Sequence, residues 1–274
     1  MNESALPKLV TFDGEARSGK GTIVQATKDY LRDECGYNVM LIDAGQVFRV
    51  LVVCATNTGV DMTDPAAIDA FLANDEQAEV CVQFVKSVYH MTRDERDSLL
   101  YTNEVGANSA KIGARPLSQQ FKDELLKKWL RDAGEEGYQV VLLDGRALEE
   151  TGLMLEAEKL CRFVMGLYFV CDAVVGARRT LGYAATAYDQ LTTAQRTEVD
   201  ELIIQIDARN AADRNRMVQP IVRPSDAPVF ELPNTDGFIV SDDRYMATID
   251  TSADMEKHEM AMPVARMVAA QLKR

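Results

Sequence analysis

Gly14, Gly19 and Lys20 have the spacing G-x-x-x-x-G-K, which is typical of a loop that holds phosphate groups. Glycine lets the backbone bend so that successive N–H groups point into one concavity, and lysine adds a compact positive charge. The apolar run over residues 9–13 predicts a strand before the loop, and residues 23–30 predict a helix after it, whose N-terminus also favours anions. A glycine-rich turn with an exposed lysine is the competing interpretation. The flanking strand and helix favour the phosphate loop.

A second group of candidate residues is Arg209, Asp213 and Arg216, which are four and three positions apart. We predict a helix over residues 200–216, in which these side chains would share one face. Two guanidinium groups around a carboxylate can clamp a phosphate through charge-assisted hydrogen bonds. The alternative is a surface ladder of ion pairs, which would contribute little to stability.

Asp144 ends an apolar run over residues 139–144 and is followed closely by Arg146. A carboxylate at the end of a strand beside a phosphate loop is the usual partner of Mg²⁺, often through water. The loop ends on the hydroxyl of Thr22. We therefore predict that Thr22 and Asp144 are the metal-binding residues.

Strands and helices that alternate along the chain must position these residues. We predict strands over residues 9–13, 38–43, 139–144, 167–171 and 245–249, and helices over 44–56, 117–133, 200–216 and 253–272. The strands are near-continuous apolar runs, which suit a parallel sheet covered on both faces. The order predicts a doubly wound α/β fold with ligands at the carboxyl ends of its strands, where Asp43, Gly45 and Arg49 lie.

Residues 61–104 interrupt this alternation. We predict a short helix over residues 64–72, a strand-like run over 80–89 and a polar turn over 91–97, which indicate a small insertion containing a hairpin. Pro116 predicts a helix break at residues 114–115. Residues 231–244 predict a surface loop or hairpin, because proline, glycine and several acidic residues occur together there.

The composition is that of a globular protein with a net negative charge. The chain has 274 residues, of which 47% are hydrophobic, and a formal net charge of −13. This charge disfavours nucleic-acid and anionic-membrane binding, so an anionic nucleotide requires a local basic pocket. Five scattered cysteines without a CxxC pair, and two histidines, disfavour a zinc site. Residues 1–7 lack the features of a signal peptide, and we expect a cytoplasmic monomer.

With these residues together, the chain resembles the bacterial-type cytidylate kinases, a branch of the nucleoside monophosphate kinase family. Four segments carry the resemblance: residues 14–22, 43–49, 144–146 and 209–216, the last close to the pattern R-D-x-x-D-R-x-R. The resemblance implies the P-loop kinase fold, an α/β fold with a five-stranded parallel sheet flanked by helices. It further implies one kinase domain over residues 1–274, with an inserted substrate-binding subdomain over 61–105 and a lid over 176–216.

The resemblance also implies ATP-dependent phosphoryl transfer to CMP or dCMP, with ATP and Mg²⁺ as cofactors. The implied donor-binding residues are Gly14, Glu15, Ala16, Arg17, Ser18, Gly19, Lys20, Gly21, Thr22 and Arg178, with Arg179 beside Arg178 in the lid. The implied catalytic residues are Lys20, Arg146, Arg209 and Arg216. The implied substrate-binding residues are Asp43, Gly45, Arg49, Tyr101, Arg146 and Asp213.

Four positions depart from the family pattern. The family usually has serine at Ala44, arginine at Tyr101 and aspartate at Ala147, all at or near the pyrimidine. It commonly has glycine at Arg17 in the phosphate loop. These differences leave open a kinase of the same fold that acts on another nucleotide or a small alcohol. A nucleotide-binding regulator without turnover is a third possibility, which the complete set of arginines disfavours.

Overall fold

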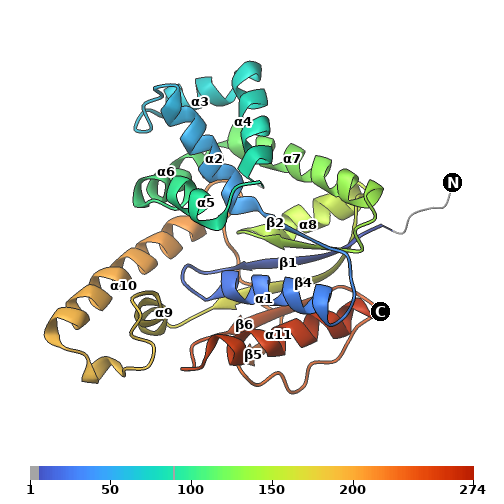
Figure 1. The fold of residues 1–274 in the computed structure, drawn as a ribbon, viewed down its shortest axis with the longest axis vertical. Helices are drawn as coiled ribbons and strands as arrows, with labels where there is room; N and C mark the ends of the chain where they lie inside the picture. The colour runs from blue at the N-terminus through green and yellow to red at the C-terminus, as the bar shows by residue number, and fades with distance from the viewer. Residues whose placement is uncertain (1–5, 89) are drawn as a thin grey trace. The chain divides into compact units, whose positions relative to one another are not determined.

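The computed structural model describes residues 6–88 and 90–274 (Figure 1). The elements in chain order are β1 (Lys8–Gly14), α1 (Lys20–Asp33), β2 (Val39–Asp43), α2 (Ala44–Asn57), α3 (Pro65–Leu72), α4 (Asp75–Val88), α5 (Arg93–Leu100), α6 (Asn103–Gly113), α7 (Pro116–Glu135), β3 (Val140–Asp144), α8 (Leu148–Ala157), β4 (Arg162–Val170), α9 (Ala173–Thr180), η1 (Tyr188–Gln190), α10 (Thr193–Arg214), β5 (Val229–Glu231), β6 (Tyr245–Asp250) and α11 (Lys257–Leu272). The chain forms two compact units. The sheet unit is Met1–Ile42 with Leu130–Arg274, and the helical unit is Asp43–Trp129.

The sheet has the strand order β2-β3-β1-β4-β6-β5, and β1 pairs in parallel with both β3 and β4. Helices α1 and α11 pack together on one face, and α8 lies on the other (Figure 1). The predicted α/β class is therefore confirmed. The sheet has six strands where five were expected, because the short strand β5 extends the edge in parallel with β6. Prolines at 228 and 233 flank β5 and obscured it in the sequence.

The central strands are buried on both faces, as their apolar sequences require. All residues of β1 after Lys8 are buried, and so are the first four of β3. Phe12 of β1 stacks on Phe169 of β4 with ring centroids 6.0 Å apart. Phe12 also pairs in register with Asp144 of β3. This register brings Asp144 beside the start of the phosphate loop.

The helical unit corrects two predictions. The strand-like run over residues 80–88 is part of helix α4, and residue 89 lies outside the described residues. The buried side chains of α4 are Cys81, Val85 and Val88, spaced four and three apart as on a helix, and their β-prone types concealed this period. The polar turn predicted over residues 91–97 is largely helix α5, which begins with a capping box between Thr92 and Glu95. The predicted hairpin is therefore wrong.

The segment over residues 176–216 contains the last part of α9 and all of η1 and α10. Ala16 of the phosphate loop packs in one apolar cluster with Ala177, Leu191, Val199 and Ile206 of this segment. Helix α10 begins at Thr193, earlier than predicted, because Thr192 and Gln195 form a capping box. It ends at Arg214, so Arg216 follows the helix and is not on its face as predicted.

The remaining predicted boundaries differ by a few residues. The break at Pro116 is confirmed, since α6 ends at Gly113 and α7 begins at Pro116. Apart from the last residue of β5, residues 231–244 form the predicted irregular loop. Among the described residues, every helix is too short or too polar to cross a lipid bilayer.

Candidate active site

The phosphate loop joins β1 to α1, and two of its turns require glycine. Gly14 has φ +140°, and a Cβ atom there would lie 2.3 Å from the carbonyl oxygen of Phe169. Gly19 has φ +78° and caps the N-terminus of α1, directly before Lys20. The left-handed region strongly favours glycine. The motif glycines are therefore explained by a close backbone contact and by the turn into the helix.

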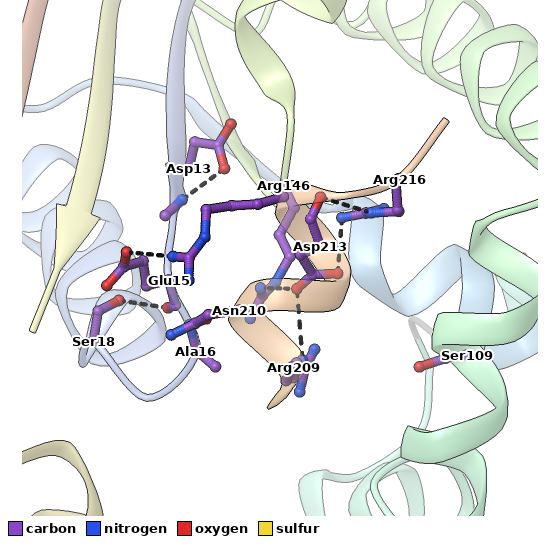
Figure 2. A network of polar contacts seen from close by, with 12 residues as sticks. Asp13, Glu15, Ala16, Ser18, Ser109, Arg146, Arg209, Asn210, Asp213 and Arg216 are labelled. Carbon is purple, nitrogen blue, oxygen red and sulfur yellow. Dashed lines mark hydrogen bonds and ion pairs between the residues drawn. The ribbon is translucent and has the colours of Figure 1, made fainter. Parts of the chain in front are cut away.

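One hydrogen bond within the loop and two from other segments hold its backbone. The hydroxyl of Ser18 donates to the carbonyl of Glu15 at 3.0 Å, and the hydroxyl of Thr251 donates to the carbonyl of Ser18 at 2.8 Å. The N–H of Ala16 donates to Oδ1 of Asn210 in α10 at 2.8 Å (Figure 2). These bonds fix the loop backbone before any ligand binds, which reduces the entropy cost of binding.

Lys20 and Asp144 form an ion pair within the sheet unit. The two side chains are 14% and 17% exposed, so both remain accessible to a ligand. A carboxylate and the Thr22 hydroxyl are hard oxygen donors of the kind that Mg²⁺ prefers. Among the described residues there is no cluster of three or more His, Cys, Asp or Glu side chains that could hold a metal. The chemistry of these two oxygen donors suits Mg²⁺.

Asp213 is the centre of a cluster of three arginines (Figure 2). Its carboxylate forms an ion pair with Arg146, lies 3.0 Å from a terminal nitrogen of Arg216 and lies 3.9 Å from Nε of Arg209. Burial lowers the pKa of Arg216, Arg146 lowers it further, and Asp213 opposes both effects. The structure thus brings together Arg209, Asp213 and Arg216, which were predicted to form a clamp, and adds Arg146 to them.

Asp13 has a structural role that the sequence analysis missed. Its carboxylate accepts hydrogen bonds from the N–H of Gly14 at 2.6 Å and the N–H of Leu148 at 2.8 Å. Burial raises the pKa of Asp13, while these bonds and the charges of Lys20 and Arg146 lower it. Asp13 therefore ties the phosphate loop to the start of α8, next to the segment that carries Arg146. The position of Asp13 directly before Gly14 is the sequence feature from which this role could have been predicted.

The loop also carries an acidic residue with a partner in α10. The carboxylate of Glu15 lies 3.2 Å from a terminal nitrogen of Arg214. Burial raises the pKa of Glu15, and Arg214 is the largest influence that lowers it. Asn210 and Arg214 are one helical turn apart, and both contact the loop. Neither residue belongs to the sites predicted from the sequence.

Arg178 and Arg179, predicted to close over ATP, contact acceptors within the sheet unit. Arg178 is 5% exposed, donates to the carbonyl of Ala184 at 2.9 Å and lies 3.2 Å from the Asp254 carboxylate. Arg179 donates to the carbonyl of Ala253 at 2.5 Å. Both arginines therefore contact residues of the segment that follows β6.

The helical unit contains a second cluster of predicted site residues, which are Asp43, Arg49 and Tyr101. Asp43 caps α2 by accepting from the N–H of Gln46 at 3.1 Å, and its other oxygen accepts from the Tyr101 hydroxyl at 3.0 Å. The Arg49 guanidinium lies 4.4 Å from the centroid of the Tyr101 ring and donates to the carbonyl of Leu100 at 2.8 Å. A Cβ atom on Gly45 would lie 3.1 Å from Asp43 Oδ1. Tyr101 thus fixes an acidic and a basic side chain together.

Known proteins resemble this chain over most of its length. The family model described as Cytidylate kinase matches residues 10–235. The chain is 28% identical over 250 residues to a protein named Cytidylate kinase from Aeromonas hydrophila, covering 90% of this chain and 94% of that one. It is 28% identical over 224 residues to one of the same name from Aliivibrio salmonicida, covering 81% and 88%. A Cytidylate kinase from Shewanella pealeana is 27% identical over 236 residues, covering 85% and 90%.

Proposed function

The chain belongs to the cytidylate kinase family, and we propose that it transfers the γ-phosphoryl group of ATP to CMP or dCMP, giving CDP or dCDP. The observation that carries this proposal is the Asp213 cluster, in which one carboxylate holds three arginines. Phosphoryl transfer needs positioning and charge neutralisation more than a covalent nucleophile. A protein that only binds nucleotides has no need of such a cluster.

The donor triphosphate would bind in the phosphate loop. The backbone N–H groups of residues 14–22 and the N-terminus of α1 would face the phosphate oxygens. Lys20 would exchange its contact with Asp144 for one with the β- and γ-phosphates. Mg²⁺, held by Thr22 and Asp144, would neutralise part of the phosphate charge.

The arginine cluster would act on the transferred group. Arg209 and Arg216 would stabilise negative charge on the equatorial oxygens, and Arg146 would hold the acceptor phosphate. Asp213 would orient the arginines and accept a hydrogen bond from the sugar. Because Asp213 already holds the guanidinium groups, little reorganisation would accompany the reaction.

The acceptor would also contact the helical unit. Arg49 would bind its phosphate, while Asp43, Gly45 and Tyr101 would line the nucleoside site. Tyr101 offers a ring and a hydroxyl already bonded to Asp43, so it would orient Arg49 rather than supply a charge. We further propose that residues 61–105 act as the substrate-binding insertion and residues 176–216 as a lid. The enzyme would act as a cytoplasmic monomer.

A second acceptor base is the alternative function, and specific residues favour it. Ala44 and Ala147 have no side-chain group that can hydrogen-bond a base. Sites that hydrogen-bond a substrate group discriminate strongly, whereas apolar sites discriminate weakly. Tyr101 likewise stands where the family has arginine. We therefore expect UMP to be accepted better than by relatives that have serine, arginine and aspartate at positions 44, 101 and 147.

A coupled assay of ADP release across a panel of acceptors tests the proposal. The panel consists of CMP, dCMP, UMP, AMP, GMP, dTMP and a small alcohol, each at saturating MgATP. We expect the highest kcat/KM with CMP or dCMP. Turnover of a purine monophosphate or an alcohol without turnover of CMP would contradict the proposal, and so would ATP binding without turnover of any acceptor.

A further inference from the structure

Arg17 occupies a backbone position that suits glycine. Its φ is +61°, in the left-handed region. In this region the Cβ atom of every residue except glycine lies too close to the following carbonyl oxygen. The two motif glycines of the same loop also have positive φ, without this cost. Strain of this kind concentrates at functional sites. The chain therefore has an arginine at a position where the backbone conformation favours glycine.

The neighbouring helix fixes the start of this side chain. A Cβ atom on Gly176 of α9 would lie 3.0 Å from the carbonyl oxygen of Arg17 and 3.3 Å from its Cβ. The absence of a side chain at Gly176 therefore lets α9 approach the backbone of the phosphate loop. Arg17 itself is exposed.

Three other arginines near the loop already have protein partners. Arg178 pairs with Asp254, Arg179 donates to the carbonyl of Ala253, and Arg214 pairs with Glu15. Glu15 also adds a negative charge to the loop that would hold a polyanion. Arg17, by contrast, has no ion pair with a carboxylate in the described part of the chain.

We propose that the Arg17 guanidinium binds the polyphosphate of the donor nucleotide from the rim of the loop. This inference rests on the proposed function and assigns the side chain, in addition to the loop backbone, to the donor site. Arg17 supplies positive charge at the loop, whereas Arg178 and Arg179 contact acceptors of the protein itself. A guanidinium suits this role because its planar fork binds phosphate oxygens through two parallel hydrogen bonds.

Calorimetric titration with MgATP, in the absence of any acceptor, tests the inference in four variants. Arg17→Ala and Arg17→Gly both remove the charge, but only Arg17→Gly relieves the backbone. Arg17→Lys keeps a charge, and Arg32→Ala removes an exposed arginine from α1 as a matched control. We expect both Arg17→Ala and Arg17→Gly to raise Kd for MgATP about tenfold, which is about 1.4 kcal/mol. We expect Arg17→Lys to raise it less and Arg32→Ala not to change it.

Thermal melting distinguishes the effect of the missing side chain from the effect of relieved backbone strain. Arg17→Gly should melt about 2 °C above Arg17→Ala, a difference typical of relieved left-handed strain in a chain of this size. Equal Kd values for the wild type and Arg17→Ala, within a factor of two, would overturn the inference. So would weaker binding in Arg17→Gly alone, since flexibility would then be the cause. A wild type that binds no MgATP would overturn the proposed function and this inference with it.

Discussion

Replacing Arg216 with alanine distinguishes a catalytic arginine cluster from a structural one. The Arg216 side chain is 14% exposed and lies 3.0 Å from the Asp213 carboxylate. Burial is the largest influence on the pKa of Arg216 and lowers it, so desolvation opposes much of the attraction to Asp213. In the variant, Asp213 keeps its contacts with Arg146 and Arg209. We therefore expect the free energy of unfolding to change by no more than about 1 kcal/mol, or Tm by about 2–4 °C.

The kinetic effect should be much larger. Removing one group that stabilises charge in a transition state costs about 10²–10³ in kcat, or about 2.7–4 kcal/mol. The assay is coupled ADP release at saturating MgATP and CMP, measured on the same samples as Tm. A fall in kcat with little change in the KM for ATP would indicate that Arg216 acts in the transition state.

Two further variants calibrate this experiment. Asp213→Ala leaves Arg146 and Arg216 partly buried without their carboxylate, which we expect to cost about 3–5 kcal/mol of stability. Arg32→Ala removes an arginine that is 52% exposed and should change neither kcat nor Tm. Arg216 has a structural and not a catalytic role if Arg216→Ala lowers Tm as much as Asp213→Ala while keeping more than a tenth of wild-type kcat.

Three other predictions address the loop, the lid and the base. Lys20→Ala should lower kcat at least about 10²-fold with an unchanged far-UV circular dichroism spectrum, and more than a tenth of wild-type kcat would contradict its role at the phosphates. Residues 176–216 should exchange amide hydrogens faster without ligand than with a bisubstrate analogue, whereas equal protection would remove the lid from the mechanism. Ala147→Asp should raise the ratio of kcat/KM for CMP over UMP, because aspartate tolerates the φ of +56° found there and adds an acceptor for the cytosine amino group. A wild-type preference for CMP of 10⁴ or more would mean that other residues recognise the base.

The sequence alone was sufficient for features that depend on local spacing. The glycines, Lys20 and the flanking strand and helix predicted the phosphate loop, since all of these lie within one short segment. Buried apolar runs predicted a parallel sheet, and parallel strands place their carboxyl ends at one edge, which brought Asp144 to the loop. The spacing of Arg209 and Asp213 likewise placed them on one helix.

The local sequence pattern gave wrong predictions at two elements, α4 and β5. Residues 80–88 are rich in β-prone side chains, yet they form helix α4 because Cys81, Val85 and Val88 pack into one buried cluster. The short strand β5 forms because it can pair with β6 at the edge of the sheet, and its own sequence does not predict it. In both cases packing against distant residues outweighs intrinsic propensity.

Contacts between residues far apart in the chain were decided only by the tertiary structure. The carboxylate of Asp13 reaches Leu148, and Asn210 reaches the backbone of Ala16. Gly14 must be glycine because the backbone of Phe169 passes beside it. Sequence spacing determines which residues share a helix face or a loop. Which groups lie within hydrogen-bond reach across more than a hundred residues depends on how the strands and helices pack, and a single sequence does not encode that in any local pattern.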